Sequence, residues 1–336
     1  MIKLAVDAMG GDFAPVEIIK GVNIAIKKHE DLQLVLYGDK DEIEKYLEKN
    51  DRVEIVHTPY KFSMGEKDPI RAIRNNKELS LVKAFQAVKD KECQGAVTCG
   101  PTQGVVVAAH MIVKKLPGMQ RVALAPSLPF INGKSRMLCD VGANVELRPE
   151  HILQIVVFAS TFLKKTRGIS DPKVGLLNIG VEPGKGREQD RETYKLLSEC
   201  KDINFLGNVE PTSLLDTECD LLVNDGFSTN LIMKTTEGVA KSIGQLLKEN
   251  IKSSLGGKIG YLFMRKNLKK FKETLSGDEV GGSLLFGVDG VIVKGHGSSK
   301  GYSFSRAIEL CMRGVESGYI EIMRDYLLNE ENNKQE

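Results

Sequence analysis

Residues 2–28, IKLAVDAMGGDFAPVEIIKGVNIAIKK, hold the pattern that decides the fold of this chain. The short apolar run Ile2–Val6 predicts a buried strand, and the apolar residues of Val16–Lys28 recur at helical spacing. A turn that contains Gly10 and Gly11 separates the two segments. A strand, a loop and a helix in this order form the repeating unit of α/β proteins, so the stretch predicts a layered sheet covered by helices.

The same order of short apolar runs and longer amphipathic segments recurs along the chain. The predicted strands are Ile2–Val6, Leu32–Tyr37, Val53–Val56, Gly95–Thr98, Val122–Ala125, Met137–Asp140, Val174–Asn178, Asn204–Leu206, Leu221–Asn224 and Val291–Lys294. Helical patterns lie between most of them, for example Val16–Lys28, Asp41–Glu48, Pro149–Lys165 and Arg191–Cys200. This alternation predicts a parallel sheet with helices on both faces, and ligands that bind beyond the carboxyl ends of the strands.

The composition is that of an ordinary globular protein with little overall charge. The 336 residues include 47 Lys and Arg against 45 Asp and Glu, which gives a net charge of +2. This balance excludes a globally basic nucleic-acid-binding protein, and the absence of Trp leaves little for an aromatic platform that stacks bases. No run of about 18 apolar residues occurs, so we expect no membrane-spanning helix and a cytoplasmic location.

The cysteines and histidines show no redox or metal-binding spacing. Cysteines stand at positions 93, 99, 139, 200, 219 and 311, with no C-x-x-C pair. A chain of this length needs no disulfides, so we expect buried thiols in a reducing compartment. Four histidines, at 29, 57, 110 and 151, are isolated, and no G-x-G-x-x-G follows the first strand. We therefore expect neither a metal nor another cofactor.

Glycines gather in six loops that follow predicted strands. These loops are residues 7–12, 99–104, 141–144, 179–187, 225–230 and 295–299. The backbone N–H groups of glycine-rich loops can approach an anion closely, so we expect the six loops to form one anion-binding cleft. Ordinary turn punctuation is the alternative interpretation.

Two stretches resemble motifs of other enzyme classes, but each lacks a residue that the motif requires. Gly133-Lys134-Ser135 is like the end of a P-loop, but the glycine required five positions before Gly133 is Leu128. The stretch 297–301 fits the nucleophile elbow of serine hydrolases, but no histidine follows Ser298. The sequence therefore supports neither nucleotide binding through a P-loop nor a serine hydrolase.

Several blocks in and around the loops form a recognisable series. They are Val6-Asp7-Ala8-Met9-Gly10-Gly11-Asp12 with Ala14-Pro15, Asp68–Arg74, Asp140–Val145, Val174–Gly180, Asn204–Glu210, Asp225–Phe227, Leu285–Gly287 and Val293–Ser299. In this order they resemble the PlsX family of bacterial phosphate acyltransferases, over residues 2 to about 310. The 295–299 stretch also looks like the His-Gly-Ser loop of isocitrate and isopropylmalate dehydrogenases.

The resemblance implies a fold and a division of the chain. The fold is a Rossmann-like layered α/β sheet of the isocitrate and isopropylmalate dehydrogenase, or phosphotransacetylase, type. A basic helical hairpin is added to two closely packed subdomains. Subdomain one takes about residues 1–140 and 281–336, and subdomain two about residues 141–280. The family resemblance also implies a homodimer.

The reaction that the resemblance implies is the transfer of a fatty acyl group from acyl-acyl-carrier-protein to inorganic phosphate. The product, acyl phosphate, serves phospholipid synthesis. Phosphate is itself a nucleophile, so the site needs to bind and orient an anion and to stabilise the oxyanion, without an activated Ser or Cys. The resemblance implies no metal.

We expect Lys185 and Asn230 to be catalytic. Lys185 stands between two glycines, where its ammonium could bind phosphate or stabilise charge on the oxyanion or the leaving sulfur; an exposed loop lysine is the alternative. Asn230 could donate an amide N–H to the oxyanion or cap a helix. The expected phosphate- and thioester-binding residues are Gly10, Gly11, Gly100, Thr102, Asn144, Asn178, Arg187, Ser228, Thr229, His296 and Ser298.

Some of these residues have a structural alternative. Asn144 and Asn178 could tie loops together, and Arg187 could be solvated. Pro101, Gln103 and Thr229 depart from the pattern usual in the family. These departures keep open a non-catalytic paralogue that binds carrier protein or lipid. A metal-dependent dehydrogenase on the same fold is the other alternative, although Asp225 has no clear acidic partner in the sequence.

Residues 251–276 form a basic amphipathic segment. Seven Lys or Arg and no acidic residue stand between Lys252 and Lys272, and apolar residues recur at helical spacing. Such a segment is typical of contact with an anionic membrane surface or an acidic partner such as acyl carrier protein, which would place the enzyme at the inner face of the cell membrane. A hairpin packed in a dimer interface is the alternative. The expected contact residues are Leu255, Lys258, Ile259, Leu262, Arg265, Lys266 and Lys269.

Overall fold

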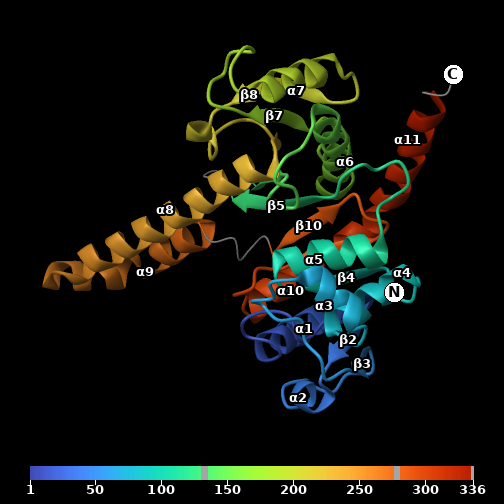
Figure 1. Cartoon of the computed structure of the whole chain (residues 1–336). Coiled ribbons are helices and arrows are strands. Elements are labelled where there is room, and N and C mark those ends of the chain that lie inside the picture. The colour runs from blue at the N-terminus through green and yellow to red at the C-terminus, as the bar shows by residue number, and fades with distance from the viewer. Residues whose placement is uncertain (130–134, 276–280, 334–336) are drawn as a thin grey trace.

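A computed structural model describes residues 1–129, 135–275 and 281–333 as one sheet covered by helices (Figure 1). In this part of the chain the sheet has 11 strands, in the order β3-β2-β1-β4-β11-β10-β5-β6-β9-β7-β8. Their bounds are β1 Ile2–Asp7, β2 Leu32–Gly38, β3 Val53–His57, β4 Gly95–Thr98, β5 Ala123–Pro129, β6 Ser135–Cys139, β7 Lys173–Leu177, β8 Asn204–Val209, β9 Leu221–Val223, β10 Ser283–Phe286 and β11 Val291–Lys294.

The helices follow most strands directly, as the sequence pattern predicts. Their bounds are α1 Val16–Lys28, α2 Lys40–Glu44, α3 Pro69–Asn75, α4 Ser80–Lys89, α5 Thr102–Ala108, α6 Pro149–Arg167, α7 Glu188–Glu199, α8 Gly226–Lys252, α9 Leu255–Leu275, α10 Gly301–Ser317 and α11 Tyr319–Asn333. A π-helical turn, η1 Ala109–Val113, continues α5, and a short 3-10 turn, η2 Pro211–Ser213, follows β8.

The sheet is mixed, so the expectation of a wholly parallel sheet is wrong. Strands β3, β2, β1, β4 and β11 are parallel, and so are β6, β9, β7 and β8. Between these blocks β10 is antiparallel to both β11 and β5, and β5 is antiparallel to β6. Three successive reversals leave the two blocks running in opposite directions.

Side chains that alternate along the strands build the core on both faces of the sheet. In β1, Leu4 and Val6 pack with α1 and α10, whereas Ala5 faces α4 and α5. Beyond β10, Phe158 and Phe162 of α6 contact Tyr319 with ring centroids 5.5 and 5.1 Å apart. These rings join residues from the two predicted subdomains in one continuous core.

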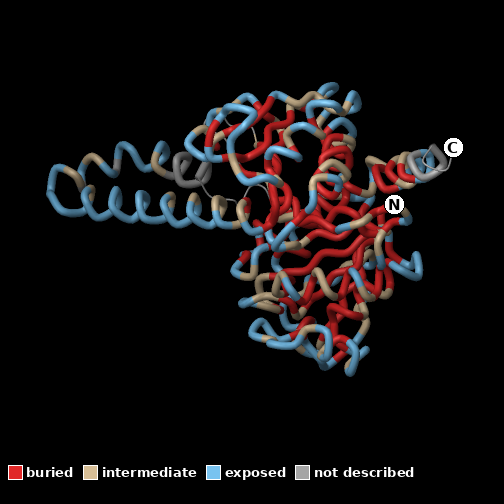
Figure 2. Tube along the Cα trace, turned by 45° about the horizontal axis from the view of Figure 1, so that its top comes forward, coloured by how far each residue is buried: buried red, intermediate tan, exposed pale blue. Residues whose placement is uncertain are grey.

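Helices α8 and α9 form a hairpin that projects from the body of the molecule (Figures 1 and 2). Among the side chains of the hairpin that the structure describes, Ile232 and Met233 at the beginning of α8 pack against the second block. The outer part of the hairpin is mostly exposed. Among the described helices, including these two, none is long and apolar enough to cross a membrane. The described part of the predicted basic segment, residues 251–275, corresponds to α9 and the last residues of α8, whereas the long helix α8 was not predicted from the sequence.

Candidate active site

The six glycine-containing loops lie at two edges of the sheet instead of one. Loops 7–12, 99–104 and 295–299 follow β1, β4 and β11, which are neighbours in the first block. The other three loops follow β6, β7 and β9 of the second block, which runs in the opposite direction. The expectation that all six meet at one edge is therefore wrong, because the reversals at β10 and β5 turn the second block around.

A buried aspartate holds the first group of loops together. Asp7 accepts hydrogen bonds from the hydroxyls of Ser80 at 2.6 Å and Thr98 at 2.7 Å. The Thr98 hydroxyl in turn accepts from the backbone N–H of Gly100 at 2.9 Å. Burial raises the pKa of Asp7 above its usual value of 3.8, against these hydrogen bonds. Asp7 therefore links the 7–12 loop to Thr98 and, through Thr98, to the start of the 99–104 loop.

Gly10 and Gly11 are required by this packing. A Cβ on Gly10 would lie 2.4 Å from Asp7 Oδ2 and 2.9 Å from Thr98 Oγ1, closer than side-chain carbons approach such atoms. Gly11 has φ of +116°, a conformation that glycine adopts readily and other residues rarely. Packing alone thus explains both glycines, and their predicted contact with phosphate stays a prediction.

An ion pair holds the second group of loops. Asp225 caps α8 by accepting from Ser228 N at 2.8 Å, and its other oxygen lies 2.7 Å from Arg187 Nη2. Arg187 also contacts Asp190 at 2.9 Å. Hydrogen bonds with Asp190 raise the pKa of Arg187, with a further contribution from Asp225. Arg187 is therefore paired with two carboxylates, although half of its side chain remains exposed to solvent.

The two predicted asparagines bond to neighbouring backbone. Asn178 Nδ2 donates to Lys185 O at 3.2 Å, and Asn144 Nδ2 donates to Val122 O at 2.6 Å. Asn144 also donates to Asp140 through its backbone N–H at 2.7 Å. Both side chains tie loops together, which is the structural alternative that the sequence left open for them.

Lys185 and Asn230 lie in this second group. Lys185 is exposed, and its stem passes over Gly180, where a Cβ would lie 2.8 Å from Lys185 Cγ. Asn230 packs over Gly142, where a Cβ would lie 3.0 Å from the amide nitrogen. Because Asp225 is the helix cap, Asn230 stands beyond the cap inside α8 and does not serve as one. Its catalytic role stays a prediction.

Helix α8 connects the two groups of loops. Asn230, Lys234 and Glu237 stand at i, i+4 and i+7, on one face of its first turns. The charges of Lys234 and Glu237 act on the pKa values of Lys294 and His296, which belong to the first group. Lys234 and Glu237 of α8 therefore lie near Lys294 and His296, at the end of β11 and in the loop that follows it.

The 295–299 loop brings an imidazole and a hydroxyl together. His296 Nδ1 lies 2.8 Å from Ser298 Oγ and accepts from Ser298 N at 3.3 Å. Burial, together with the positive charges of Lys294 and Lys234, lowers the pKa of His296 below 6.5. The imidazole is therefore neutral at neutral pH and can accept a proton.

Comparison with known proteins identifies the family. The model of the fatty acid synthesis protein family matches residues 2–322. A phosphate acyltransferase of Acholeplasma laidlawii is 44% identical over 329 residues, which cover 97% of this chain and 98% of that protein. A phosphate acyltransferase of Staphylococcus aureus is 40% identical over 325 residues, with 97% and 98% covered. This chain belongs to the PlsX family. It is an acyltransferase.

Solved structures place this PlsX family member in the predicted fold. A branched-chain phosphotransacylase from Enterococcus faecalis matches with a TM-score of 0.58 and 17% identity, over 94% of this chain and 100% of that chain. A 4-hydroxythreonine-4-phosphate dehydrogenase from Klebsiella pneumoniae matches with a TM-score of 0.52 and 12% identity, over 94% and 98%. The phosphotransacetylase-like fold expected from the sequence is confirmed.

The five buried cysteines of this PlsX family member are poor nucleophiles. Five of the six thiols are buried, and Cys200 is half-buried. Burial raises the pKa of Cys99, in the first group of loops, to about 12, and that of Cys93 to about 11. A thiol that stays protonated does not attack a thioester. Among the residues that the structure describes, no group of His, Cys, Asp and Glu could hold a metal ion.

The positions that depart from the family pattern fit their surroundings. Pro101 immediately precedes α5 in an extended conformation, with φ of −66° and ψ of 141°, which proline adopts without strain. Thr102 begins α5 directly after it, and Gln103 is exposed on its first turn. Thr229 is buried inside α8, and its N–H bonds to Asp225 O at 3.1 Å. The Thr229 hydroxyl is buried and has no hydrogen-bond partner among the described residues.

The expected contact residues of the basic segment lie at and beyond the turn of the hairpin. Leu255, Ile259, Arg265 and Lys266 are exposed on α9. Lys258, Leu262 and Lys269 belong to the same helix, but their side chains lie outside those that the structure describes.

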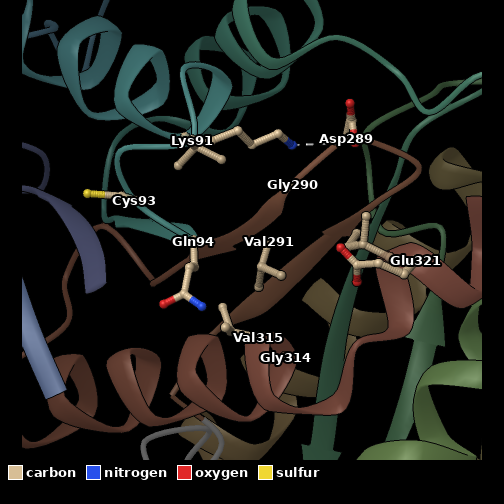
Figure 3. Close-up of a pocket in the computed structure, with 11 residues that line it drawn as sticks. Lys91, Cys93, Gln94, Asp289, Gly290, Val291, Gly314, Val315 and Glu321 are labelled. Atoms are coloured by element: carbon tan, nitrogen blue, oxygen red, sulfur yellow. Dashed lines mark ion pairs between the residues drawn. The ribbon is translucent and has the colours of Figure 1, made fainter. Parts of the chain in front are cut away.

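A pocket of about 180 Å³ lies elsewhere, at the amino ends of β4 and β11 (Figure 3). Lys91 and Asp289 form an ion pair of 3.9 Å across it, and Arg324 also contacts Asp289. The rest of its lining combines aliphatic side chains with polar ones, namely Val88, Val291, Val315 and Ile320 with Cys93, Gln94 and Glu321. Because loops 99–104 and 295–299 follow the opposite ends of the same strands, this pocket is separate from the first group of loops.

Proposed function

We propose that the protein transfers a fatty acyl group from acyl-acyl-carrier-protein to inorganic phosphate and releases acyl phosphate for phospholipid synthesis. The observation that carries this proposal is the close likeness to proteins named phosphate acyltransferase, over 97% of the chain. The buried, protonated cysteines support a reaction in which phosphate itself attacks the thioester. A dehydrogenase is not favoured, because both of these relatives are named phosphate acyltransferase.

The proposed reaction is a single displacement at the thioester carbonyl. A phosphate oxygen attacks the carbonyl carbon, the carbon–sulfur bond breaks, and the pantetheine thiolate leaves and takes up a proton. Lys185, exposed on its loop, stabilises negative charge on the carbonyl oxygen or the sulfur. Asn230 donates an amide N–H to the same oxyanion. The Arg187–Asp225 ion pair keeps the 179–187 loop against the start of α8, where both groups act.

The hairpin provides surfaces for a membrane and for a second copy of the chain. Leu255, Ile259 and Phe263 are largely exposed near its outer end, beside Arg265 and Lys266. We propose that this end contacts an anionic membrane surface, where the lysines and arginines attract lipid headgroups and the apolar side chains enter the interface. The acidic carrier protein could use the same basic surface. The exposed apolar side chains along one side of α8, Val239, Ile243 and Leu246, support a homodimer.

The release of free thiol tests the proposed reaction. We expect purified protein, mixed with fatty acyl-acyl-carrier-protein and inorganic phosphate, to release one thiol for each acyl phosphate formed. No thiol release from folded protein at saturating phosphate would refute the reaction. Lys185→Ala is expected to lower turnover and leave the thermal midpoint nearly unchanged, because the side chain is exposed. Lys195→Ala, on the nearby helix α7, serves as a matched control.

Sedimentation with vesicles tests the membrane contact. Leu255→Glu combined with Ile259→Glu is expected to abolish binding to vesicles that contain anionic lipid. Ile24→Glu with Tyr46→Glu is the control, because it adds the same charge at exposed apolar residues away from the hairpin. Equal binding by both double variants would favour a hairpin that is covered by the dimer partner instead.

A further inference from the structure

Lys294 is a partly buried lysine with no carboxylate partner. It is the last residue of β11 and lies in register with Thr98 of β4, so loops 99–104 and 295–299 both begin beside it. Its ammonium donates to Gly295 O at 3.0 Å. Among the residues that the structure describes, no Asp or Glu lies within ion-pair distance of its Nζ. Buried lysines are rare unless they are paired, so this unbalanced charge calls for an explanation.

The groups around Lys294 do not neutralise it. The Cys99 thiol is close, but burial raises the pKa of Cys99 to about 12, so it remains protonated at neutral pH. Glu237 on α8 is engaged by Lys234 at 2.8 Å. Burial lowers the pKa of Lys294, and the positive charge of Lys234 contributes to the same effect. An anion that bound here could therefore pair with the Lys294 ammonium, because no described carboxylate already does so.

The position of Lys294 fits the region where the reaction must occur. The charges that act on Lys294 and His296 come from Lys234 and Glu237, which share a face of α8 with Asn230. One helical turn of about 5.4 Å separates Asn230 from Lys234. A phosphate held by Lys294 would thus lie near the face of α8 that carries Asn230.

We propose that Lys294 binds the phosphate acceptor, with its ammonium as the cation that pairs with the phosphate oxygens. This inference rests on the proposed function and assigns the acceptor to the first group of loops. Lys185, in the second group, then serves the thioester. Lys294 is not among the site residues predicted from the sequence, although it ends a predicted strand of otherwise apolar residues. A charged residue at that point of a buried strand is the signal that could have found it.

Binding of inorganic phosphate to the full chain tests this directly. We expect phosphate to raise the thermal midpoint of the wild type, because a ligand that binds only the folded state stabilises it. Lys294→Met should lose this shift, whereas Lys300→Met, which removes an exposed lysine from the adjacent loop end, should keep it. Lys294→Gln is the second variant if Lys294→Met does not fold, and Lys294→Arg should restore part of the shift.

The kinetic expectation separates this inference from the proposed reaction. In thiol release, Lys294→Met should raise the KM for phosphate by roughly 10- to 100-fold, since a hydrogen bond to a charged group contributes that much to binding. The KM for the acyl donor should change less than about twofold. Wild-type phosphate binding in both Lys294→Met and Lys294→Gln overturns the inference, and so does a wild type that binds no phosphate. Loss of phosphate binding in these variants, with no thiol release by the wild type, would support the anion site and refute the reaction.

Discussion

The ion pair between Asp225 and Arg187 gives a quantitative test of how the second group of loops is held. Asp225 is 1% exposed and serves two partners: it caps α8 through Ser228 N and lies 2.7 Å from Arg187. Asp225→Asn retains an oxygen that can cap the helix, since Asn and Asp are equally good caps, and removes only the charge. Asp225→Ala removes both interactions.

The expected changes in the free energy of unfolding depend on how exposed Arg187 is and on the partner that it keeps in each variant. A hydrogen bond to a charged group contributes about 1.5–3 kcal/mol, and this must be reduced here because Arg187 is 50% exposed and keeps Asp190. We therefore expect Asp225→Asn to lower the free energy of unfolding by about 1 kcal/mol. Loss of the cap adds about 1 kcal/mol, so Asp225→Ala should cost about 2 kcal/mol.

Urea denaturation followed by circular dichroism measures these differences. With a slope of about 3 kcal/mol/M, the urea midpoint should fall by roughly 0.3 M for Asp225→Asn and 0.7 M for Asp225→Ala. In a double-mutant cycle with Arg187→Met, the charge change should couple to Arg187 by about 1 kcal/mol. A wild-type midpoint for Asp225→Asn, or strict additivity in the cycle, would refute the assignment of the pair as the tie between the 179–187 loop and α8.

Three further predictions concern stability and thiol reactivity. Gly10→Ala should destabilise the fold by about 1–3 kcal/mol in the same urea assay, while Gly184→Ala, which has open space around its Cα, should stay within about 0.5 kcal/mol of the wild type. At pH 8 the native protein should show fast reaction of one thiol with a disulfide reagent, and Cys200→Ser should remove it, because the other five thiols are buried. Burial raises the pKa of Asp7 above 3.8 in the folded protein, so the folded state takes up a proton at a higher pH than the unfolded state does. The wild type should therefore gain stability relative to Asp7→Asn as the pH falls from neutral through the raised pKa towards about 4. Urea midpoints of the two proteins that shift in parallel over this range would contradict the prediction.

Local pattern predicted most strands but not their directions. β4 and β11 are short, buried and bounded by polar or glycine residues, and their predicted bounds agree with the structure. The strand β10, Ser283–Phe286, was not predicted, because four residues beside a glycine pair carry little periodic signal. That omission had a large effect, since β10 is the first of the reversals that turn the second block around.

The loops of the site could be located from glycines, but the partners of their side chains could not. Arg187 was predicted to bind phosphate or to be solvated, whereas it meets Asp225, which lies 38 positions later in the chain, at 2.7 Å. Asn144 bonds to Val122 O for the same reason: a side chain at a strand end takes its partner from whichever strand the sheet places beside it. Sheet order depends on contacts between distant segments, and local residue spacing does not contain it.

Beyond its first turn, α8 presents two sides of different character. At about 100° per residue, Asn230, Lys234 and Glu237 share one side of the helix, and the exposed Val239, Ile243 and Leu246 lie on the opposite side. That second side continues the one on which Ile232 packs against the sheet. A partner that covers Val239, Ile243 and Leu246 would therefore leave the side with Lys234 and Glu237, near Lys294, uncovered. Association through the hairpin and the proposed reaction at the start of α8 can then occur at the same time.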